Sequence, residues 1–304
     1  MGSVLRPYQG FKSRLALAYV ASTDLYNGDT PTNNTYVDIF ADQSFEVKYP
    51  GSIILVNVRG HLFINNVTVS NEHASFALID GTTRYSLGNG YGVYHNAFAG
   101  HSMLAITGLG VGTHTIRLQT YGATGGPATY YCRASTLPNL EPLFMGVFEL
   151  ASWTHPRRRG YQGMQARLAL DSVVTADTSF ALTASAYNDI IPDQAFTILD
   201  PNSLLLTLVN MGSVDSLGAS AQVTVFAMFD STTRYLLGGD MGDVGAMCSF
   251  LTSSGPRLFA SSDLGVGSHN VKIQAYPNAA ATHNCRATAL APYEHKRVQV
   301  LELR

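Results

Sequence analysis

Apolar and polar residues alternate along most of the chain, most clearly after a Gly-rich stretch at residues 109–119. This stretch reads Leu109-Gly-Val-Gly-Thr-His-Thr-Ile-Arg-Leu-Gln119, so Ile116 and Leu118 alternate with polar neighbours. The same pattern returns as Leu264-Gly-Val-Gly-Ser-His-Asn-Val-Lys-Ile-Gln274. Such alternation predicts a half-buried antiparallel strand after a tight turn in each copy.

The Gly-rich stretch belongs to a duplication of the whole chain. Five further blocks recur in the same order, displaced by 150 to 153 residues; they begin at Tyr8 and Tyr161, Asp38 and Asp189, Asp80 and Asp230, Cys132 and Cys285, and Val147 and Val300. A unit this long is a domain rather than a solenoid repeat. We therefore predict two domains, residues 1–152 and 156–304, within the 304 residues.

Each unit reads as a series of short strands. In the first unit we expect strands at residues 11–20, 43–49, 51–58, 66–70, 74–79, 103–106, 129–134 and 144–150, with counterparts in the second. Helical periodicity is nearly absent, and only the Ala- and Ser-rich residues 171–187 could hold a turn of helix. Eight or nine strands in about 150 residues are typical of a β-sandwich.

The predicted fold class is all-β, with two tandem, duplicated antiparallel sandwiches of the jelly-roll kind. An immunoglobulin-like fold is the alternative, but its pair of Cys residues around a Trp is missing. Both units end on an apolar strand closing with Glu-Leu, at Glu149 and Glu302. We expect this strand to pair near the N-terminal strand of its unit, because domain termini often lie close together. The matching positions of the two Glu residues point to a structural role.

The C-terminal part of each unit resembles the trimeric jelly-roll heads of the tumour-necrosis-factor and complement type, and related modules on tailed-phage virions. The resemblance covers about 40 residues per unit and rests on the Gly-turn, the stretch from Gly112 to Leu118 or from Gly267 to Ile273, and the terminal Glu-Leu strand. It implies a trimer built around apolar inner faces, with a role in adhesion or in coating a particle.

Charged residues make up only 13% of the chain, about half of the usual share of about 25%. Two explanations stay open: a surface partly covered by partners, or the low Lys and Glu content of strands. The net charge of −2 and the single short basic run at residues 157–159 give no support to nucleic-acid binding. The N-terminus lacks a secretory signal, and no apolar run is long enough for a membrane helix.

Three cysteines, Cys132, Cys248 and Cys285, form neither a disulfide framework nor a zinc motif. Cys132 and Cys285 occupy equivalent places, and we expect each to be a small buried residue in a protein made in a reducing cytoplasm.

Two duplicated sets of residues could bind a metal, and for both we favour a structural reading. His114 and His269 lack partner ligands at metal-binding spacing, and a His after a Gly-turn can bond backbone groups. The pairs Asp38/Asp42 and Asp189/Asp193, with the Asp24–Asp29 stretch, could supply calcium oxygens, but Asp is also a common turn residue. We predict no metal and no cofactor.

Five residues are candidates for an interface: Arg84, Tyr85, Arg234, Tyr235 and Trp153. The two Arg-Tyr pairs are duplicated, and Arg beside Tyr suits either an interface hot spot or a strand edge where the Arg packs across the ring. Trp153, the only Trp, lies at the join of the units. It could wedge between the two domains or cap the core of one.

No catalytic motif is present: there is no Gly-x-Ser-x-Gly elbow, no phosphate-binding loop and no Cys/His pair at plausible spacing. Carboxylates paired from distant positions, as in a glycosidase, stay possible. The leading hypothesis is therefore a non-enzymatic capsid decoration (cement) protein of a tailed phage, located on the capsid surface after synthesis in the host cytoplasm.

As partners we expect further copies of the chain, as a homotrimer, and the major capsid protein or other virion proteins, with no nucleic acid and no membrane. The alternative is a receptor- or carbohydrate-binding tail or fibre module, since 16 Tyr and 14 Phe could stack on sugars. A third is a major capsid protein of double jelly-roll type, which usually needs a longer chain.

Overall fold

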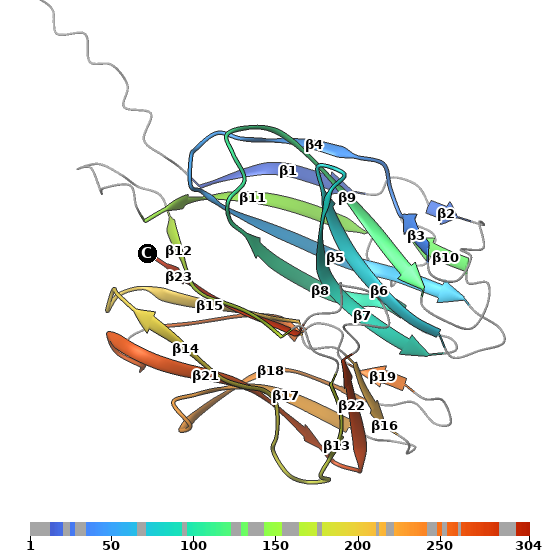
Figure 1. The fold of residues 1–304 in the computed structure, drawn as a ribbon, viewed down its shortest axis with the longest axis vertical. Helices are drawn as coiled ribbons and strands as arrows, with labels where there is room; N and C mark the ends of the chain where they lie inside the picture. Colours follow the sequence, from blue (N-terminus) through green and yellow to red (C-terminus); the bar gives the residue numbers. More distant parts are fainter. Residues whose placement is uncertain are drawn as a thin grey trace, which may run out of the picture.

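A computed structural model describes residues 13–20, 25–27, 35–65, 71–92, 96–122, 129–132, 143–153, 164–174, 178–210, 213–216, 222–241, 248–250, 254–260, 263–285 and 296–304. These residues form 23 strands, which confirms the all-β sandwich class. They include no helix long and apolar enough to cross a membrane. Figure 1 shows two sandwiches, one drawn above the other.

The first sandwich consists of two sheets whose strands pair antiparallel. One sheet has the order β1 (Arg14–Val20), β11 (Phe144–Ser152), β5 (Ile53–Asn65), β8 (Asn96–Ile106). The short strands β2 (Leu25–Asn27) and β10 (Thr129–Cys132) extend it next to β5. The other sheet has the order β4 (Gln43–Val47), β9 (Gly112–Gly122), β6 (Asn71–Ile79), β7 (Thr83–Gly92), with β3 (Thr35–Asp38) also on β9.

The second sandwich repeats this arrangement. One sheet has the order β12 (Gln165–Val174), β23 (Lys296–Leu303), β15 (Leu204–Asn210), β20 (Ser254–Ala260). The facing sheet has the order β14 (Asn188–Ile198), β21 (Gly267–Pro277), β17 (Gln222–Phe229), β18 (Thr233–Met241). A small third sheet comprises β13 (Thr178–Leu182), β22 (Ala281–Cys285), β16 (Ser213–Ser216) and β19 (Cys248–Phe250).

The strand order of each sandwich is that of a jelly roll. In the first copy the chain crosses from one sheet to the other at every connection between long strands except the hairpin from β6 to β7. This is the path of two Greek keys wound together. The bulge between Leu15 and Leu17 in β1 recurs between Leu168 and Leu170 in β12, so the duplication extends to local irregularities.

Several predicted elements agree with the structure. The strand after each Gly-turn is β9 or β21, and its apolar positions are buried, as Ile116 and Ile273 illustrate. The terminal strands β11 and β23 pair with the first strands β1 and β12, which confirms the expected closure of each unit. The turn of helix allowed for residues 171–187 is wrong in the described part, where β12 continues to Val174 and β13 follows. The strand expected at residues 66–70 lies outside the described residues.

Three apolar cores separate four stacked layers of strands, and the two inner layers are joined where β11 pairs in parallel with β12. The first fills the first sandwich and contains Ile54, Val56 and Val147. The second fills the second sandwich and contains Leu205, Val298 and Val300. The third lies between the sandwiches and consists of Ile53, Leu55, Ala105, Leu150, Ala166, Leu208, Leu301 and Leu303. We call this third core the seam.

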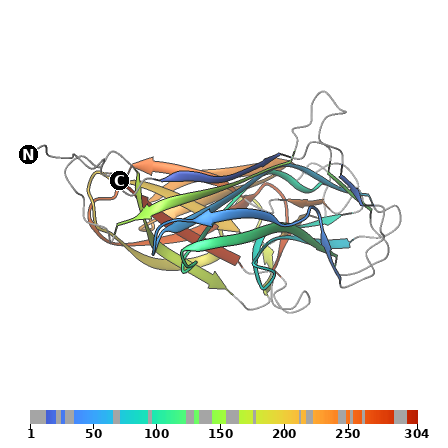
Figure 2. The same ribbon diagram turned by 90° about the horizontal axis from the view of Figure 1, so that it is seen from above.

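The seam explains why some strands are apolar on both faces. Consecutive residues of β5 point to opposite sides, so Ile54 enters the first core while Ile53 and Leu55 enter the seam. The same holds for β11, β15 and β23. In Figure 1, β12, β15 and β23 lie on the side of the second sandwich that faces the first, with β14, β21, β17 and β18 beyond them. Viewed from above, the principal strands of both sandwiches run roughly across the picture from side to side (Figure 2).

Candidate interaction surface

Each Gly-turn is built by two glycines that other residues would fit poorly. Gly108 and Gly112 have φ of 84° and 145°, and Gly265 and Gly267 have φ of 86° and 141° in the second copy. Positive φ is accessible to Gly because it has no Cβ. Gly112 and Gly267 are equivalent and begin the strand that carries the following His, whereas Gly265 aligns with Gly110 and not with Gly108, so the two turns share only this one glycine conformation.

The His after each turn fastens it to the sheet. His114 Nδ1 lies 2.8 Å from Asp80 Oδ2, and its Nε2 lies 2.9 Å from the carbonyl oxygen of Gly110. Asp80 also accepts a hydrogen bond of 2.8 Å from the amide of Thr115. The ring of His114 packs against Phe45, with 5.7 Å between centroids. The imidazole thus joins the turn to the β6–β7 hairpin, as expected for a structural His.

The second copy repeats this arrangement, which we call the His–Asp clamp. His269 Nδ1 lies 2.7 Å from Asp230 Oδ2, and its Nε2 lies 3.1 Å from the carbonyl oxygen of Gly265. The amide of Asn270 donates to Asp230 at 2.9 Å. Asp80 and Asp230 both adopt positive φ, 50° and 49°, which turns each carboxylate toward its clamp. No group of three or more His, Cys, Asp or Glu suited to a metal ion occurs within the described residues.

The hydrogen bond to Asp80 raises the pKa of His114 above its ordinary value of 6.5, against the smaller effect of burial. Burial acts to raise the pKa of Asp80, but the hydrogen bonds from His114 and Thr115 outweigh it, so this pKa lies below 3.8. Both shifts favour the ion pair of the first clamp. Asp230 shows the same lowered pKa, with burial opposed by the hydrogen bonds from His269 and Asn270.

Each clamped turn presents an apolar side chain to solvent. Val111 lies between Gly110 and Gly112 and is 59% exposed, and its counterpart Val266 is 56% exposed. A single exposed valine would need no explanation. The same valine exposed twice, on two turns held by the same contacts, is a repeated surface feature.

The contacts of β1 place the first Gly-turn at the end of the molecule where β1 begins. Gly112 pairs with Val47 at the end of β4. The neighbouring carbonyl oxygen, that of Glu46, accepts a hydrogen bond from Arg14, the first residue of β1. The turn and the beginning of β1 therefore lie close together.

The second Gly-turn lies at the same end. Gly267 pairs with Ile198 at the end of β14, and the adjacent carbonyl accepts a hydrogen bond from Arg167 near the beginning of β12. The beginnings of β1 and β12 are neighbours, because Ser13 Oγ donates to the carbonyl oxygen of Met164 at 2.6 Å. Both exposed valines thus belong to one end of the molecule, which we call the Gly-turn end.

Two buried carboxylates hold the Gly-turn end together. Glu149 is fully buried; it accepts hydrogen bonds of 2.9 Å from the amides of Lys48 and Tyr49, 3.1 Å from Ser52 Oγ and 2.8 Å from Arg14 Nε. The equivalent Glu302 accepts from Leu199, Asp200, Ser203 and Arg167. The structural role predicted for both residues is confirmed.

The Asp pairs considered for calcium are engaged in side-chain contacts on the outer sheets. Arg117 donates to Asp38 at 2.6 Å and to both carboxylate oxygens of Asp42, at 2.7 and 2.9 Å. In the second copy Lys272 donates to Asp189 at 3.1 Å. These contacts agree with the structural reading, although their basis is ion pairing rather than turn chemistry. Asp193 is exposed, and residues 28–34, which include part of the Asp24–Asp29 stretch, lie outside the described residues.

The two candidate Arg residues lie over Tyr rings on the outer sheets. Arg84 Cζ is 3.9 Å from the centroid of Tyr36, and its Nε donates to Gln119 at 2.9 Å. Arg234 repeats this with Tyr187, at 4.0 Å, and with Gln274, at 2.9 Å. Both guanidinium groups are thus fixed on the sheet that faces away from the seam.

The other interface candidates lie nearer the cores. Tyr85 packs on the first core, and Arg297 of the second sandwich lies 5.9 Å from its ring. Tyr235 packs edge-on against Phe229, with 5.7 Å between centroids. Burial raises the pKa of both tyrosines.

Trp153 follows β11 at the junction of the sandwiches. Its amide donates to the carbonyl oxygen of Ala166 at 3.2 Å. Arg304 and Arg167 lie 4.2 and 5.4 Å from its ring centroid. Both partners belong to the second sandwich, so the side chain bridges the join of the two units.

Sequence reasoning missed two features of the seam. One is the buried amide of Gln299, which bonds to both backbone groups of Ala105 across the seam. The other is an apolar pocket between the two sandwiches, whose lining includes Leu15 and Met164. Both depend on how the two units pack, and no residue pattern within one unit reveals that. The side chains of the three cysteines lie outside the described parts.

No protein-family model matches the chain, and no curated protein matches it. Among solved structures it is similar to the tandem CBM22 domains of Paenibacillus barcinonensis Xyn10C, with 8% identity, 97% of this chain and 98% of that chain covered, and a TM-score of 0.21. The PBSX exported protein XepA shares 6% identity over 96% and 86% of the chains, with a TM-score of 0.17. A Macrobrachium rosenbergii nodavirus structure shares 9% identity over 95% and 98%, with a TM-score of 0.19. These likenesses are loose, and TM-scores this low do not establish a common topology.

Proposed function

We propose that the chain is a non-enzymatic structural protein of a virion, a capsid decoration protein that binds the outer shell as an oligomer and stabilises it. The observation that carries this proposal is the matched pair of Gly-turns. Each presents an exposed valine, Val111 or Val266, from a turn fastened by the same clamp, and both lie at one end of the molecule.

A fastened turn suits binding because little conformational freedom is lost when it docks. The His–Asp clamp fixes the path of the turn before any partner arrives. The exposed valine at the tip of each turn has no polar group in its side chain, so it fits an apolar socket on another protein. Two equal tips fit two equal sockets, and a shell assembled from many copies of one protein offers such repeated sockets.

The surroundings of the tips support contact with a protein surface. Leu199, Leu15 and Met164, all at the Gly-turn end, are 55%, 51% and 49% exposed. The charged groups nearby are largely paired, as Arg14 with Glu149 and Arg167 with Glu302 illustrate. Covering this end would remove apolar surface from water without stranding an unpaired charge.

The direct test compares particles of the virus that encodes this chain, prepared with and without it. We expect particles that carry the chain to release their genome at a higher temperature, because a ligand that binds only the assembled shell stabilises that state. Equal release temperatures would contradict the proposal.

Substitutions at the tips locate the contact. The double variant Val111→Asp, Val266→Asp should be absent from purified particles, because each charge would have to be buried in an apolar socket. Leu236→Asp is the matched control: Leu236 is 50% exposed but lies on the edge strand β18, outside both Gly-turns. We expect this control to bind and protect like the natural chain. Loss of binding in the control alone would place the contact elsewhere.

The oligomeric state is tested by light scattering after size exclusion. One chain is 32.7 kDa, and we expect the mass of a homotrimer, as the resemblance to trimeric jelly-roll heads implies. A stable monomer would remove that part of the proposal.

A further inference from the structure

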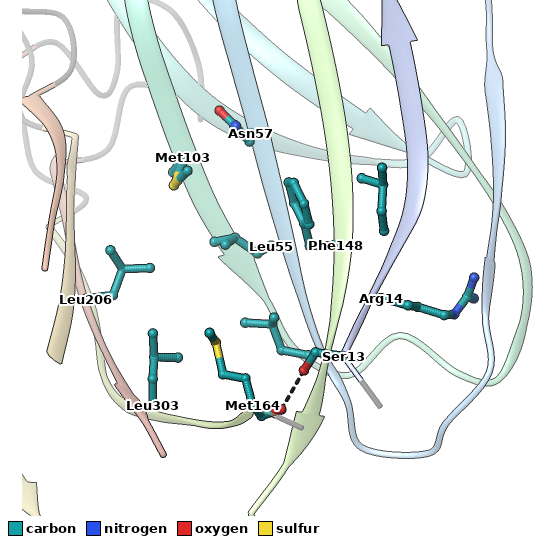
Figure 3. A pocket seen from close by; sticks show the side chains of 11 residues that line it. Ser13, Arg14, Leu55, Asn57, Met103, Phe148, Met164, Leu206 and Leu303 are labelled. Atoms are coloured by element: carbon teal, nitrogen blue, oxygen red, sulfur yellow. Dashed lines mark hydrogen bonds between the residues drawn. The ribbon is translucent and has the colours of Figure 1, made fainter. Parts of the chain in front are cut away.

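A pocket of about 530 Å³ opens at the seam. Figure 3 shows side chains of both sandwiches around it, with Leu55, Phe148 and Met103 on the side of the first and Leu206, Leu303 and Met164 on the side of the second. Its volume lies within the range of small-molecule sites, which are mostly apolar concavities at domain interfaces.

The walls of the pocket are fixed in place by contacts between the sandwiches. At one edge Ser13 Oγ donates to the carbonyl oxygen of Met164 at 2.6 Å and accepts from the amide of Ala151 at 3.3 Å. Across the seam Gln299 bonds to Ala105 through both ends of its amide. The space is therefore formed before any ligand enters it.

The polar groups around the pocket are already engaged. Arg14 is paired with the buried Glu149 and also donates to Glu46 O. Ser13 has the two partners just named, and Asn57 has an interaction within the chain. A charged ligand group would find no unpaired opposite charge among these residues, so the pocket selects by apolar contact.

The two copies of the chain differ at this place. Leu15 at the pocket is 51% exposed, whereas its counterpart Leu168 packs into the seam. Met164 at the mouth is 49% exposed. The exposure of Leu15 is therefore specific to the first copy, where this side chain lines the pocket. The equivalent strand position of the second copy does not share it.

From this geometry we propose that the seam pocket binds the aliphatic chain of an uncharged amphiphile, with the polar head at the mouth. Leu side chains supply an apolar wall, and Met103 and Met164 can adjust their rotamers to a flexible chain. The head stays in water, so binding needs no polar partner inside. This inference goes beyond the proposed virion function and does not rest on it, although Leu15 and Met164 at the mouth also belong to the Gly-turn end.

The test uses the full chain labelled with ¹³C at the methionine methyl groups and titrated with 1-decanol. Met103 and Met164 line the pocket, while Met145 and Met228 are buried, do not line it and serve as internal controls. We expect saturable shifts at Met103 and Met164 with little change at the two controls. Decanoate has the same number of carbon atoms as decanol but a charged head, and it should bind at least about tenfold more weakly than decanol.

Two substitutions on β1 test the location. Leu15 and Val20 are both 51% exposed, but only Leu15 lines the pocket. Leu15→Trp should fill the mouth and weaken decanol binding by about tenfold or more, whereas Val20→Trp should leave it unchanged. The proposal is overturned if no saturable shift occurs, if all four methionines shift alike, or if Leu15→Trp binds decanol as well as Val20→Trp.

Discussion

The side-chain amide of Gln299 pairs with both backbone groups of Ala105 on the opposite side of the seam. The amide of Ala105 donates to Oε1 at 2.9 Å, and Nε2 donates to the carbonyl oxygen of Ala105 at 2.7 Å. Both residues are almost fully buried. One side chain thus satisfies the backbone of an edge strand, β8, at a point inside an otherwise apolar interface.

Replacing Gln299 by Leu should destabilise the chain by about 2–3 kcal/mol, because it strands a buried N–H and a buried C=O of Ala105. Urea unfolding followed by the fluorescence of Trp153 measures this, since that residue bridges the two units. Gln43→Leu, at a partly exposed position, is the control and should change stability by less than about 0.5 kcal/mol. Equal effects of the two substitutions would show that the seam gains nothing from this contact.

Glu149→Gln and Glu302→Gln should each cost about 3 kcal/mol. A Gln cannot supply the charge that pairs with Arg14 or Arg167, and its NH₂ group would face backbone donors. The two variants should behave alike, because the two networks have equivalent partners. Unfolding by urea, with each variant measured beside the natural chain, checks the magnitude; a change in only one of them would contradict the equivalence.

Thr207→Val should stabilise the chain by about 1 kcal/mol. Thr207 is fully buried, and its Oγ1 has no hydrogen-bond partner among the described residues. The equivalent position of the first sandwich holds Val56, which is also fully buried. Valine has the shape of threonine without the hydroxyl, so the unmet hydrogen bond disappears at little packing cost. Val56→Thr is the reverse control and should lower the free energy of unfolding.

The first His–Asp clamp should weaken at alkaline pH. Both contacts of the His114 ring are to acceptors, Asp80 and the carbonyl of Gly110, so the imidazolium with two N–H donors satisfies them best. Because the pKa of His114 is raised in the folded state, its contribution is complete below 6.5 and is lost as the pH rises through the folded value. Because the pKa of Asp80 is lowered, the contribution of the carboxylate is present above 3.8 and is lost as the pH falls through its folded value.

Two measurements check this pH dependence. The titration of His114 by NMR should have a midpoint above 6.5, and Asp80→Asn should move the midpoint down toward that value. The stability difference between the natural chain and His114→Asn should be larger near pH 5 than above the folded pKa. A midpoint below 6.5 in the natural chain would exclude the clamp as drawn.

Much of the fold could be predicted because the relevant signals are local. Alternation around Ile116 and Ile273 identified the strands after the turns, and the matching Glu149 and Glu302 identified a structural pair. The possible helix at residues 171–187 was wrong because its Ala and Ser content reflects partly exposed strands. The clamp could be predicted only in part: the His residues were expected to bond backbone groups, but their Asp partners lie 34 and 39 residues away.

The seam could not be predicted because it breaks the symmetry of the repeat. The repeat aligns Gln299 with Gly146, where a Cβ would come within 2.9 Å of the ring of Phe144. One position therefore needs the smallest residue in one copy and a long amide in the other. The packing of the two sandwiches against each other explains this difference between Gly146 and Gln299.

The four-layer stack also divides the chain into parts that tolerate change differently. Strands β5, β11, β15 and β23 have an apolar core on both sides, so neither face can accept a polar substitution cheaply. The outer sheets each keep one face in water. Sequence divergence among future variants, natural or engineered, should therefore accumulate on β4, β9, β6 and β7 and on β14, β21, β17 and β18, and new recognition properties are most readily acquired there.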